Sequence, residues 1–128
     1  MAAKKSKALR ILVADDSKVS RQLAVNLLKD LQHEVALAAT GQQAVKAVQE
    51  EKFDLVLMDM QMPELDGVEA TAKIRQHEKS TRSHVPIIAV TAAWTKGDRE
   101  RCLAAGMDDY ISKPIAPDEL SRVLKKFS

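Results

Sequence analysis

The sequence is poor in the residue types that mark several functional classes. It has one cysteine, Cys102, so it can form neither an intrachain disulfide nor a cysteine zinc cluster. Aromatic residues make up 3% of the chain, which argues against stacking platforms for single-stranded nucleic acid. No apolar run approaches the length of a membrane span, and the first ten residues lack the apolar stretch of a signal peptide. We therefore expect a cytoplasmic protein that contacts neither nucleic acid nor a membrane.

Charge is nearly balanced over the chain but unevenly placed. The formal net charge is +2, from 20 basic and 18 acidic side chains. The first ten residues hold Lys4, Lys5, Lys7 and Arg10. Without them acidic side chains outnumber basic ones, so no basic face for nucleic acid is expected. The 128 residues, of which 45% are hydrophobic, suit one globular domain. We expect a basic leader over residues 1–8 and the domain over residues 9–128.

Short apolar runs alternate with longer amphipathic stretches along the chain. The runs are rich in Val, Ile and Leu, and most are too short for helices, so we predict strands buried on both faces. They occupy residues 9–14, 35–38, 55–58, 86–90 and 110–111. Such alternation predicts an α/β fold, in which a five-stranded parallel sheet carries helices on both faces and the crossovers are right-handed.

The first amphipathic stretch carries apolar residues at helical spacing. Such a stripe normally marks the face that a helix packs against the core. Its members are Val19, Leu23, Leu27 and Leu31, widened by Ala24 and Leu28. We therefore predict that this stripe is the buried face of the first helix.

The other four helices are marked mainly by signals at their ends. Residue pairs that could cap a helix start precede three of them, and the first pair has capping-box spacing, in which side chains at both positions bind free backbone N–H groups. These pairs are Thr40 with Gln43, Asp66 with Glu69, and Thr95 with Asp98. Gly106 is expected to end the fourth helix and Pro117 to open the fifth. The apolar residues assigned to the third and fifth helices are Val68, Ala72, Ile74, Leu120, Val123, Leu124 and Phe127.

Polar side chains follow four of the predicted strands at the point where each strand ends. Asp15 and Asp16 follow the first strand, Asp59 the third, Thr91 the fourth, and Lys113 comes soon after the fifth. The carboxyl ends of parallel strands share one edge of a sheet, where ligands bind. Three carboxylates there repel one another unless a hard cation such as Mg²⁺ is present. Lysine and threonine beside them suit a phosphoryl group, and a carboxylate could attack its phosphorus.

Each of these residues alone has an ordinary structural explanation. Asp16 could be a helix cap, Thr91 a strand-end hydroxyl, and Lys113 part of a surface turn. Their placement at successive strand ends favours one functional site instead. The histidines show no metal-ligand spacing and are His33, His77 and His84.

Four motifs resemble the receiver domain of two-component response regulators. They are ILVADDS, LVLMDMQMPELDG, PIIAVTA and GMDDYISKPI, and together they span nearly the whole chain. The run KGDRERCLAAGMDDYISKPI is most similar to receivers of hybrid histidine kinases and phosphorelays. This resemblance implies the flavodoxin-like (βα)5 receiver fold.

The resemblance also implies which residues accept the phosphoryl group and hold the metal. Asp59 would be the phosphoacceptor. Mg²⁺ would be bound by the side chains of Asp16 and Asp59 and by the backbone carbonyl of Gln61, while Asp15 would act through a coordinated water.

Phosphoryl binding and switching fall to a second set of residues in this resemblance. Thr91 and Lys113 would hold phosphoryl oxygens, with the backbone N–H of Ala92 nearby. The Lys113–Pro114 peptide would be cis, which proline permits. Thr91 and Tyr110 would form the switch.

The implied function is a signalling switch rather than a turnover enzyme. A histidine kinase or histidine phosphotransfer domain would donate the phosphoryl group, the receiver would catalyse its own phosphorylation and dephosphorylation, and a downstream protein would respond. The residues after the fifth predicted helix are not expected to form an output domain, so output would come through contact with another protein or from a segment of a longer chain. Small Ala93 is expected to leave the path of attacking water open, and Trp94 to report movement of its loop.

Three other functions remain as alternatives at this stage. An aspartate-nucleophile phosphatase needs an acid two residues after the nucleophile, but Gln61 stands there and cannot donate a proton in that way. A scaffold that binds partners without phosphorylation would be expected to lose an acid or the lysine, and all are kept. Dinucleotide binding lacks its glycine fingerprint after the first strand.

Overall fold

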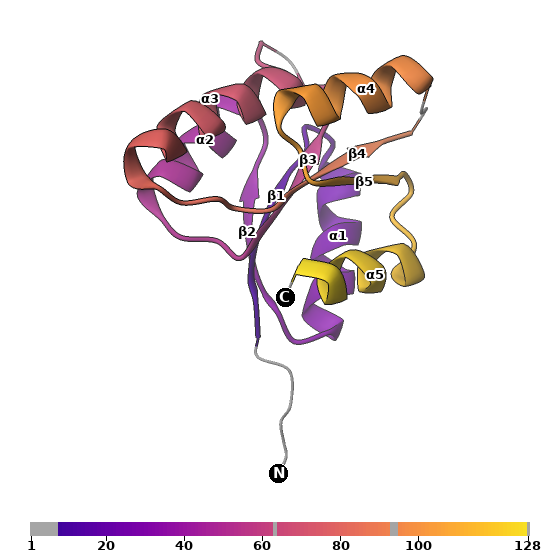
Figure 1. Ribbon diagram of the computed structural model, residues 1–128. Helices are drawn as coiled ribbons and strands as arrows, with labels where there is room; N and C mark the ends of the chain where they lie inside the picture. Colours follow the sequence, from indigo (N-terminus) through magenta and orange to yellow (C-terminus); the bar gives the residue numbers. More distant parts are fainter. Residues whose placement is uncertain (1–7, 63, 93–94, 128) are drawn as a thin grey trace.

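The computed structural model describes residues 8–62, 64–92 and 95–127. Within these ranges five strands alternate with five helices (Figure 1). The strands are β1 (Arg10–Ala14), β2 (Glu34–Ala38), β3 (Leu55–Asp59), β4 (Ile87–Thr91) and β5 (Asp109–Ser112). The helices are α1 (Lys18–Asp30), α2 (Gly41–Glu50), α3 (Gly67–Thr81), α4 (Lys96–Ala105) and α5 (Pro117–Phe127). Of the expected features, Ala93, Trp94 and most of the basic leader lie outside the described residues.

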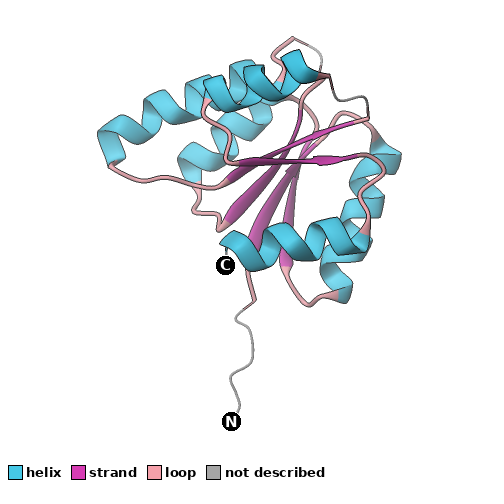
Figure 2. Ribbon diagram, turned by 45° about the vertical axis from the view of Figure 1, so that its right-hand side comes forward, coloured by secondary structure: helices cyan, strands magenta, loops and turns pink. Residues whose placement is uncertain are grey.

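All five strands are parallel and form one sheet in the order β2-β1-β3-β4-β5. Helices cover both faces of this sheet (Figure 2). Every residue of β3 and β4 is buried, as the apolar runs predict for central strands of a parallel sheet. The predicted α/β architecture is therefore confirmed, with strand limits that differ only at their ends.

The alternation of side chains along the strands divides the core into two layers. In β3, Val56 and Met58 pack with residues of α2 and α3, whereas Leu55 and Leu57 pack with residues of α1 and α5. This follows from the two-residue period of a strand, which sends successive side chains to opposite faces.

The predicted buried face of α1 is partly wrong: Ala24 and Leu28 are buried as expected, but most of the main stripe is not. Val19 is 80% exposed, Leu23 40% and Leu31 45%, whereas Ala24 and Leu28 are fully buried. Ala24 and Leu28 each follow a residue of the main stripe by one position, so the centre of the buried face is turned by about 100° around the helix from Leu23 and Leu27. Apolar residues surround so much of α1 that their spacing alone does not settle which side meets the sheet.

The end signals of the helices are confirmed, but full capping boxes form only at α3 and α4, since Gln43 Oε1 at α2 accepts from the Ala39 N–H instead. Thr40, Asp66 and Thr95 are the N-caps of α2, α3 and α4, and each side-chain oxygen accepts a hydrogen bond from the third helical N–H. Gly106 is the C-cap of α4 with φ 103°, a value that favours glycine. Pro117 is the first residue of α5.

The apolar residues predicted for α3 and α5 face the core with one exception in α3. In α3, Ile74 is buried as expected, but Ala72 is exposed, because Ala70 and Thr71 form the buried side of that turn. In α5, the buried residues are Leu120, Val123 and Leu124, and Phe127 is half-buried against the same layer. No helix in the described ranges is long and apolar enough to cross a bilayer.

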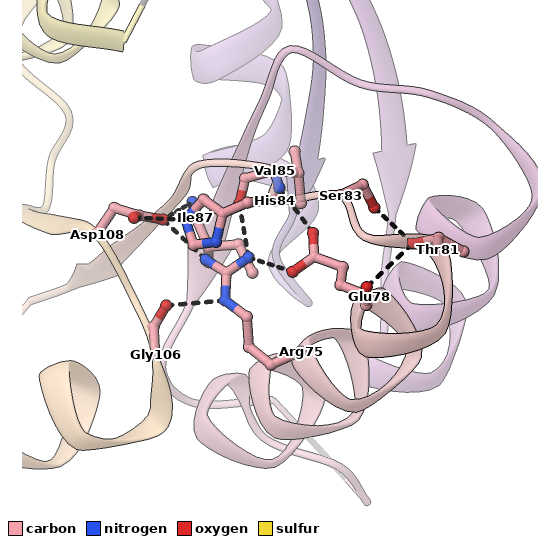
Figure 3. A network of polar contacts seen from close by, with 9 residues as sticks. All are labelled: Arg75, Glu78, Thr81, Ser83, His84, Val85, Ile87, Gly106 and Asp108. Carbon is pink, nitrogen blue, oxygen red and sulfur yellow. Dashed lines mark hydrogen bonds and ion pairs between the residues drawn. The ribbon is translucent and has the colours of Figure 1, made fainter.

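Arg75 of α3 forms a hub at the edge of the sheet where the strands begin (Figure 3). Its guanidinium donates to Glu78 Oε1 at 2.7 Å, to Asp108 Oδ2 at 2.8 Å, and to the carbonyls of Val85 and Gly106 at 2.9 Å each. These partners lie in α3, before β4, and in the turn between α4 and β5. Arg75 therefore fixes the C-terminal end of α4 to α3.

Candidate functional site

Strand register brings the predicted site residues to one edge of the sheet. Ala14 of β1 pairs with Met58 of β3, so the next residues, Asp15 and Asp59, lie side by side. Thr91, the last residue of β4, pairs with Ser112, the residue before Lys113. The convergence expected from the parallel sheet is thus present in the structure.

Three carboxylates at this edge could hold a metal ion. One oxygen from each of Asp15, Asp16 and Asp59 lies within 4.8 Å of the others. Asp15 is 5% exposed and Asp59 is 4% exposed, whereas Asp16 is open to solvent. A set of carboxylate oxygens with one solvent-facing side suits Mg²⁺, which binds oxygen ligands and keeps several waters.

Lys113 bridges the two buried carboxylates. Its Nζ lies 2.9 Å from Asp15 Oδ2 and 3.1 Å from Asp59 Oδ2. Burial by itself lowers the pKa of Lys113, but the hydrogen bonds to Asp15 and Asp59 outweigh it and raise the pKa above its ordinary value. Lys113 is therefore a firmly charged ammonium group inside the acid cluster. Its peptide bond to Pro114 is cis, as expected.

Asp59 has a raised pKa. Burial is the main cause, and the charge of Asp15 acts in the same direction. Hydrogen bonds from the Gln61 N–H, at 3.1 Å, and from Lys113 act against the rise. The ionised form of Asp59 is thus disfavoured until a cation compensates for its lost hydration.

The loop after β3 is held close to Asp59 by a glycine. The Gly67 N–H donates to the carbonyl of Met60 at 3.2 Å. A Cβ atom on Gly67 would lie 2.2 Å from the carbonyl oxygen of Asp59, so only glycine permits this approach. The start of α3 therefore rests directly on the backbone of Asp59.

A cavity of about 630 Å³ opens at this edge. Of the expected site residues it brings together Asp16, Asp59, Gln61, Thr91, Ala92 and Lys113. Asp15 belongs to the carboxylate cluster and contacts Lys113, but neither Asp15 nor Tyr110 lines the cavity. Sequence reasoning missed other lining residues, which are Met60, Met62, Asp66, Asp98 and Arg101. Asp66 and Asp98 are predicted as helix-capping residues. That role already accounts for them in the sequence, so nothing there indicates that they also line the cavity.

A (βα)5 sheet with an acid cluster and a lysine at its carboxyl edge defines a class of phosphoryl-accepting α/β domains. The model of the response regulator receiver domain family matches residues 11–125. The chain belongs to this family.

Several relatives are hybrid kinases of much greater length. Sensor protein GacS of Pseudomonas syringae pv. syringae is 44% identical over 124 residues, which cover 96% of this chain and 14% of GacS. Hybrid signal transduction histidine kinase I of Dictyostelium discoideum is 42% identical over 120 residues, or 90% of this chain and 7% of that kinase. The chain therefore spans a small part of these relatives.

Solved structures show the same fold. The receiver domain of sensor histidine kinase PA1611 from Pseudomonas aeruginosa, with a magnesium ion coordinated in its active site cleft, has a TM-score of 0.84 and 42% identity. This match covers 94% of our chain and 98% of that one. The co-crystal structure of the Saccharomyces cerevisiae histidine phosphotransfer protein Ypd1 with the receiver domain of Ssk1 gives a TM-score of 0.87 and 29% identity. That match covers 97% of our chain and 91% of that one.

Proposed function

We propose that this receiver accepts a phosphoryl group from phosphohistidine onto Asp59 and changes conformation to control a downstream protein. The observation that carries the proposal is the position of Lys113, whose ammonium group lies within 3.1 Å of the Asp59 carboxylate inside the acid cluster. Asp59 is nearly buried but borders the cavity, so a donor can reach it from one side only.

The transfer is a single displacement at phosphorus. A carboxylate oxygen of Asp59 forms the new P–O bond while the P–N bond to the donor imidazole breaks. The bonding electron pair stays on the imidazole nitrogen, which takes a proton from water. Lys113 donates a hydrogen bond to one phosphoryl oxygen. The Thr91 hydroxyl and the Ala92 N–H donate hydrogen bonds to the other phosphoryl oxygens. These groups meet the charge that spreads over the oxygens during transfer.

Mg²⁺ suits this site because the carboxylates of the site repel one another, and a cation between them reduces that repulsion. Asp16 and Asp59 would bind it directly, with the Gln61 carbonyl, and Asp15 would hold one of its waters. When bound, Mg²⁺ supplies positive charge to the cluster and to the phosphoryl oxygens. The magnesium ion in the PA1611 receiver supports this assignment.

The receiver resets itself by hydrolysis of the aspartyl phosphate. Water attacks phosphorus, and the carboxylate of Asp59 leaves. Gln61 stands two residues after Asp59, where an aspartate-nucleophile phosphatase places its acid, and Gln61 has no proton to give in that role. The domain therefore acts on its own phosphoryl group rather than on a series of small phosphoesters.

A phosphohistidine donor is proposed to dock over α1. Its imidazole must enter the cavity at the strand ends, and α1 begins next to Asp15 and Asp16. Exposed Val19 and Leu23 lie one turn apart on this helix, so they offer an apolar surface beside the entrance. A histidine phosphotransfer domain or kinase fits this surface, as the Ypd1–Ssk1 receiver complex supports. Because such donors are charged from ATP, we propose a cytoplasmic location.

Acetyl phosphate tests the phosphoacceptor function without a partner. Wild-type protein incubated with acetyl phosphate and Mg²⁺ should gain about 80 Da, the mass of one phosphoryl group, in an intact-mass spectrum. Asp59→Asn should gain nothing. Phosphate release over many turnovers without an adduct would favour a phosphatase, and an adduct that persists in Asp59→Asn would contradict the proposal.

A further inference from the structure

Tyr110 of β5 lies on the same face of the sheet as Thr91. Tyr110 pairs with Ala89 of β4, and Thr91 is two residues further along the same strand. Because the side-chain period of a strand is two, Thr91 is the diagonal neighbour of Tyr110 on that face. The residue directly opposite the tyrosine is alanine, so little bulk separates the aromatic ring from the threonine.

The backbone of Tyr110 is fixed, and its side chain is only half-buried. Its carbonyl accepts a hydrogen bond from Arg122 Nη2 at 3.3 Å, in addition to the pairing with β4. The ring packs partly against the core layer that contains Ala89. The guanidinium carbon of Arg99 lies over the ring, 5.4 Å from its centroid. This distance is within the range of a cation–π contact.

Arg99 belongs to the more loosely packed half of α4. The C-terminal half of this helix is anchored by Cys102, which is fully buried, and by the Arg75 hub that binds Gly106 (Figure 3). Arg99 is exposed, and no ion pair to its side chain is found among the described residues. The cation–π contact with the Tyr110 ring is therefore the interaction of the Arg99 guanidinium that we consider.

We propose that Arg99 is a positioning residue, which holds the Tyr110 ring in its half-buried place while Asp59 carries no phosphoryl group. This inference rests on the proposed function. When the Thr91 hydroxyl turns toward a phosphoryl group, the space over Ala89 opens, and the ring moves inward and leaves Arg99. A contact present in only one of two states biases their equilibrium by its own free energy. For an exposed cation–π pair this bias is about two- to fivefold.

Tyr110 is the only tyrosine of the chain, so 3-fluorotyrosine gives a single ¹⁹F resonance. The probe is beryllofluoride, a mimic of the phosphoryl group, added with Mg²⁺ to labelled protein. Arg99→Met is compared with Lys96→Met, which removes the same charge from the same helix at a residue with no cation–π contact to the ring among the described residues. Arg99→Met should shift the resonance of the free protein and tighten apparent beryllofluoride binding about two- to fivefold. Arg99→Lys, which keeps the cation, should lie nearer to wild type.

Two results would overturn the inference. One is an Arg99→Met protein with the resonance and beryllofluoride affinity of wild type, and the other is an equal change in Lys96→Met. In both cases a normal wild-type response to beryllofluoride leaves the proposed function standing. A wild-type protein that neither binds beryllofluoride nor gains a phosphoryl group would overturn the proposed function and this inference together.

Discussion

At the scale of single residues, the site brings together buried carboxylates whose negative charges cost folding free energy. Asp59 and Asp15 are buried side by side, and Lys113 binds both. One ammonium group compensates for two carboxylates only in part, so the metal-free site is destabilising when Asp59 is ionised. The same excess of negative charge favours the binding of a cation.

Asp59→Asn should therefore stabilise the metal-free protein. The pKa of Asp59 is raised in the folded state, so the folded state binds this proton more tightly than the unfolded state does. The stability linked to that proton is complete below the unfolded pKa, near 4, and is lost as pH rises through the folded pKa. In EDTA at pH 8, Asp59→Asn should raise Tm by a few degrees, and the difference should close toward pH 4. A lower Tm at pH 8 would contradict this account of the cluster.

Thr71 of α3 places a hydroxyl in the core, where none of the described residues is its hydrogen-bond partner. The residue is fully buried, and no hydrogen bond to its Oγ1 is present in the described part of the chain. Valine has the same shape and no polar atom, so Thr71→Val should raise the free energy of unfolding by about 1 kcal/mol in a urea titration. Thr71→Ser keeps the hydroxyl and loses a methyl group, and it should destabilise instead. A loss of stability in Thr71→Val would show that the hydroxyl has a partner.

At the scale of elements, the close contact between α3 and β3 sets the shape of the site. Gly67→Ala would place a methyl group 2.2 Å from the Asp59 carbonyl, so the backbone has to move. We expect a loss of about 1 to 3 kcal/mol in unfolding free energy and slower labelling by acetyl phosphate. Gly97→Ala is the matched control, because the nearest atom to its Cβ is 3.8 Å away and alanine favours a helix. Equal behaviour of the two variants would argue against the proposed contact.

The exposed apolar side of α1 gives a second prediction at this scale. Val19→Glu places a charge in the proposed donor-docking surface and leaves the cavity intact. The donor is a phosphorylated histidine phosphotransfer domain that is active on the wild type. Val19→Glu should slow phosphoryl transfer from this donor about tenfold or more, because a loss of about 1.4 kcal/mol at an interface corresponds to a factor of about ten. Labelling by acetyl phosphate should not change.

Leu103→Glu is the control for that measurement, because Leu103 is 54% exposed on α4. If Leu103→Glu slows transfer as much as Val19→Glu, or if Val19→Glu transfers at the wild-type rate, the donor does not dock over α1.

Sequence patterns predict some elements of this molecule and miss others for identifiable reasons. The strand ends were predictable because parallel topology alone brings Asp15, Asp59 and Thr91 to one edge. The orientation of α1 was not, because its apolar residues occur on more than one side of the helix. The Arg75 hub joins residues more than 30 positions apart, and the contact of Arg99 with Tyr110 crosses from α4 to β5. Neither has a local signal in the sequence.

At the scale of the whole molecule, the two edges of the sheet have opposite characters. The edge where strands begin is tied together by Arg75, whose partners lie in α3, just before β4 and in the turn after α4. The edge where strands end holds a cavity and a cluster of charges. We infer that a signal generated at Asp59 moves elements at the open edge while the Arg75 edge stays fixed.

The most direct test of the central claim is to locate the phosphoryl group on the chain. After reaction with acetyl phosphate and Mg²⁺, borohydride reduces an aspartyl phosphate to homoserine, which peptide mass spectrometry assigns to a position. Our account predicts homoserine in place of Asp59 only, and its absence when EDTA replaces Mg²⁺. Homoserine in place of Asp15 or Asp16, or labelling that is equally complete in EDTA, would contradict it.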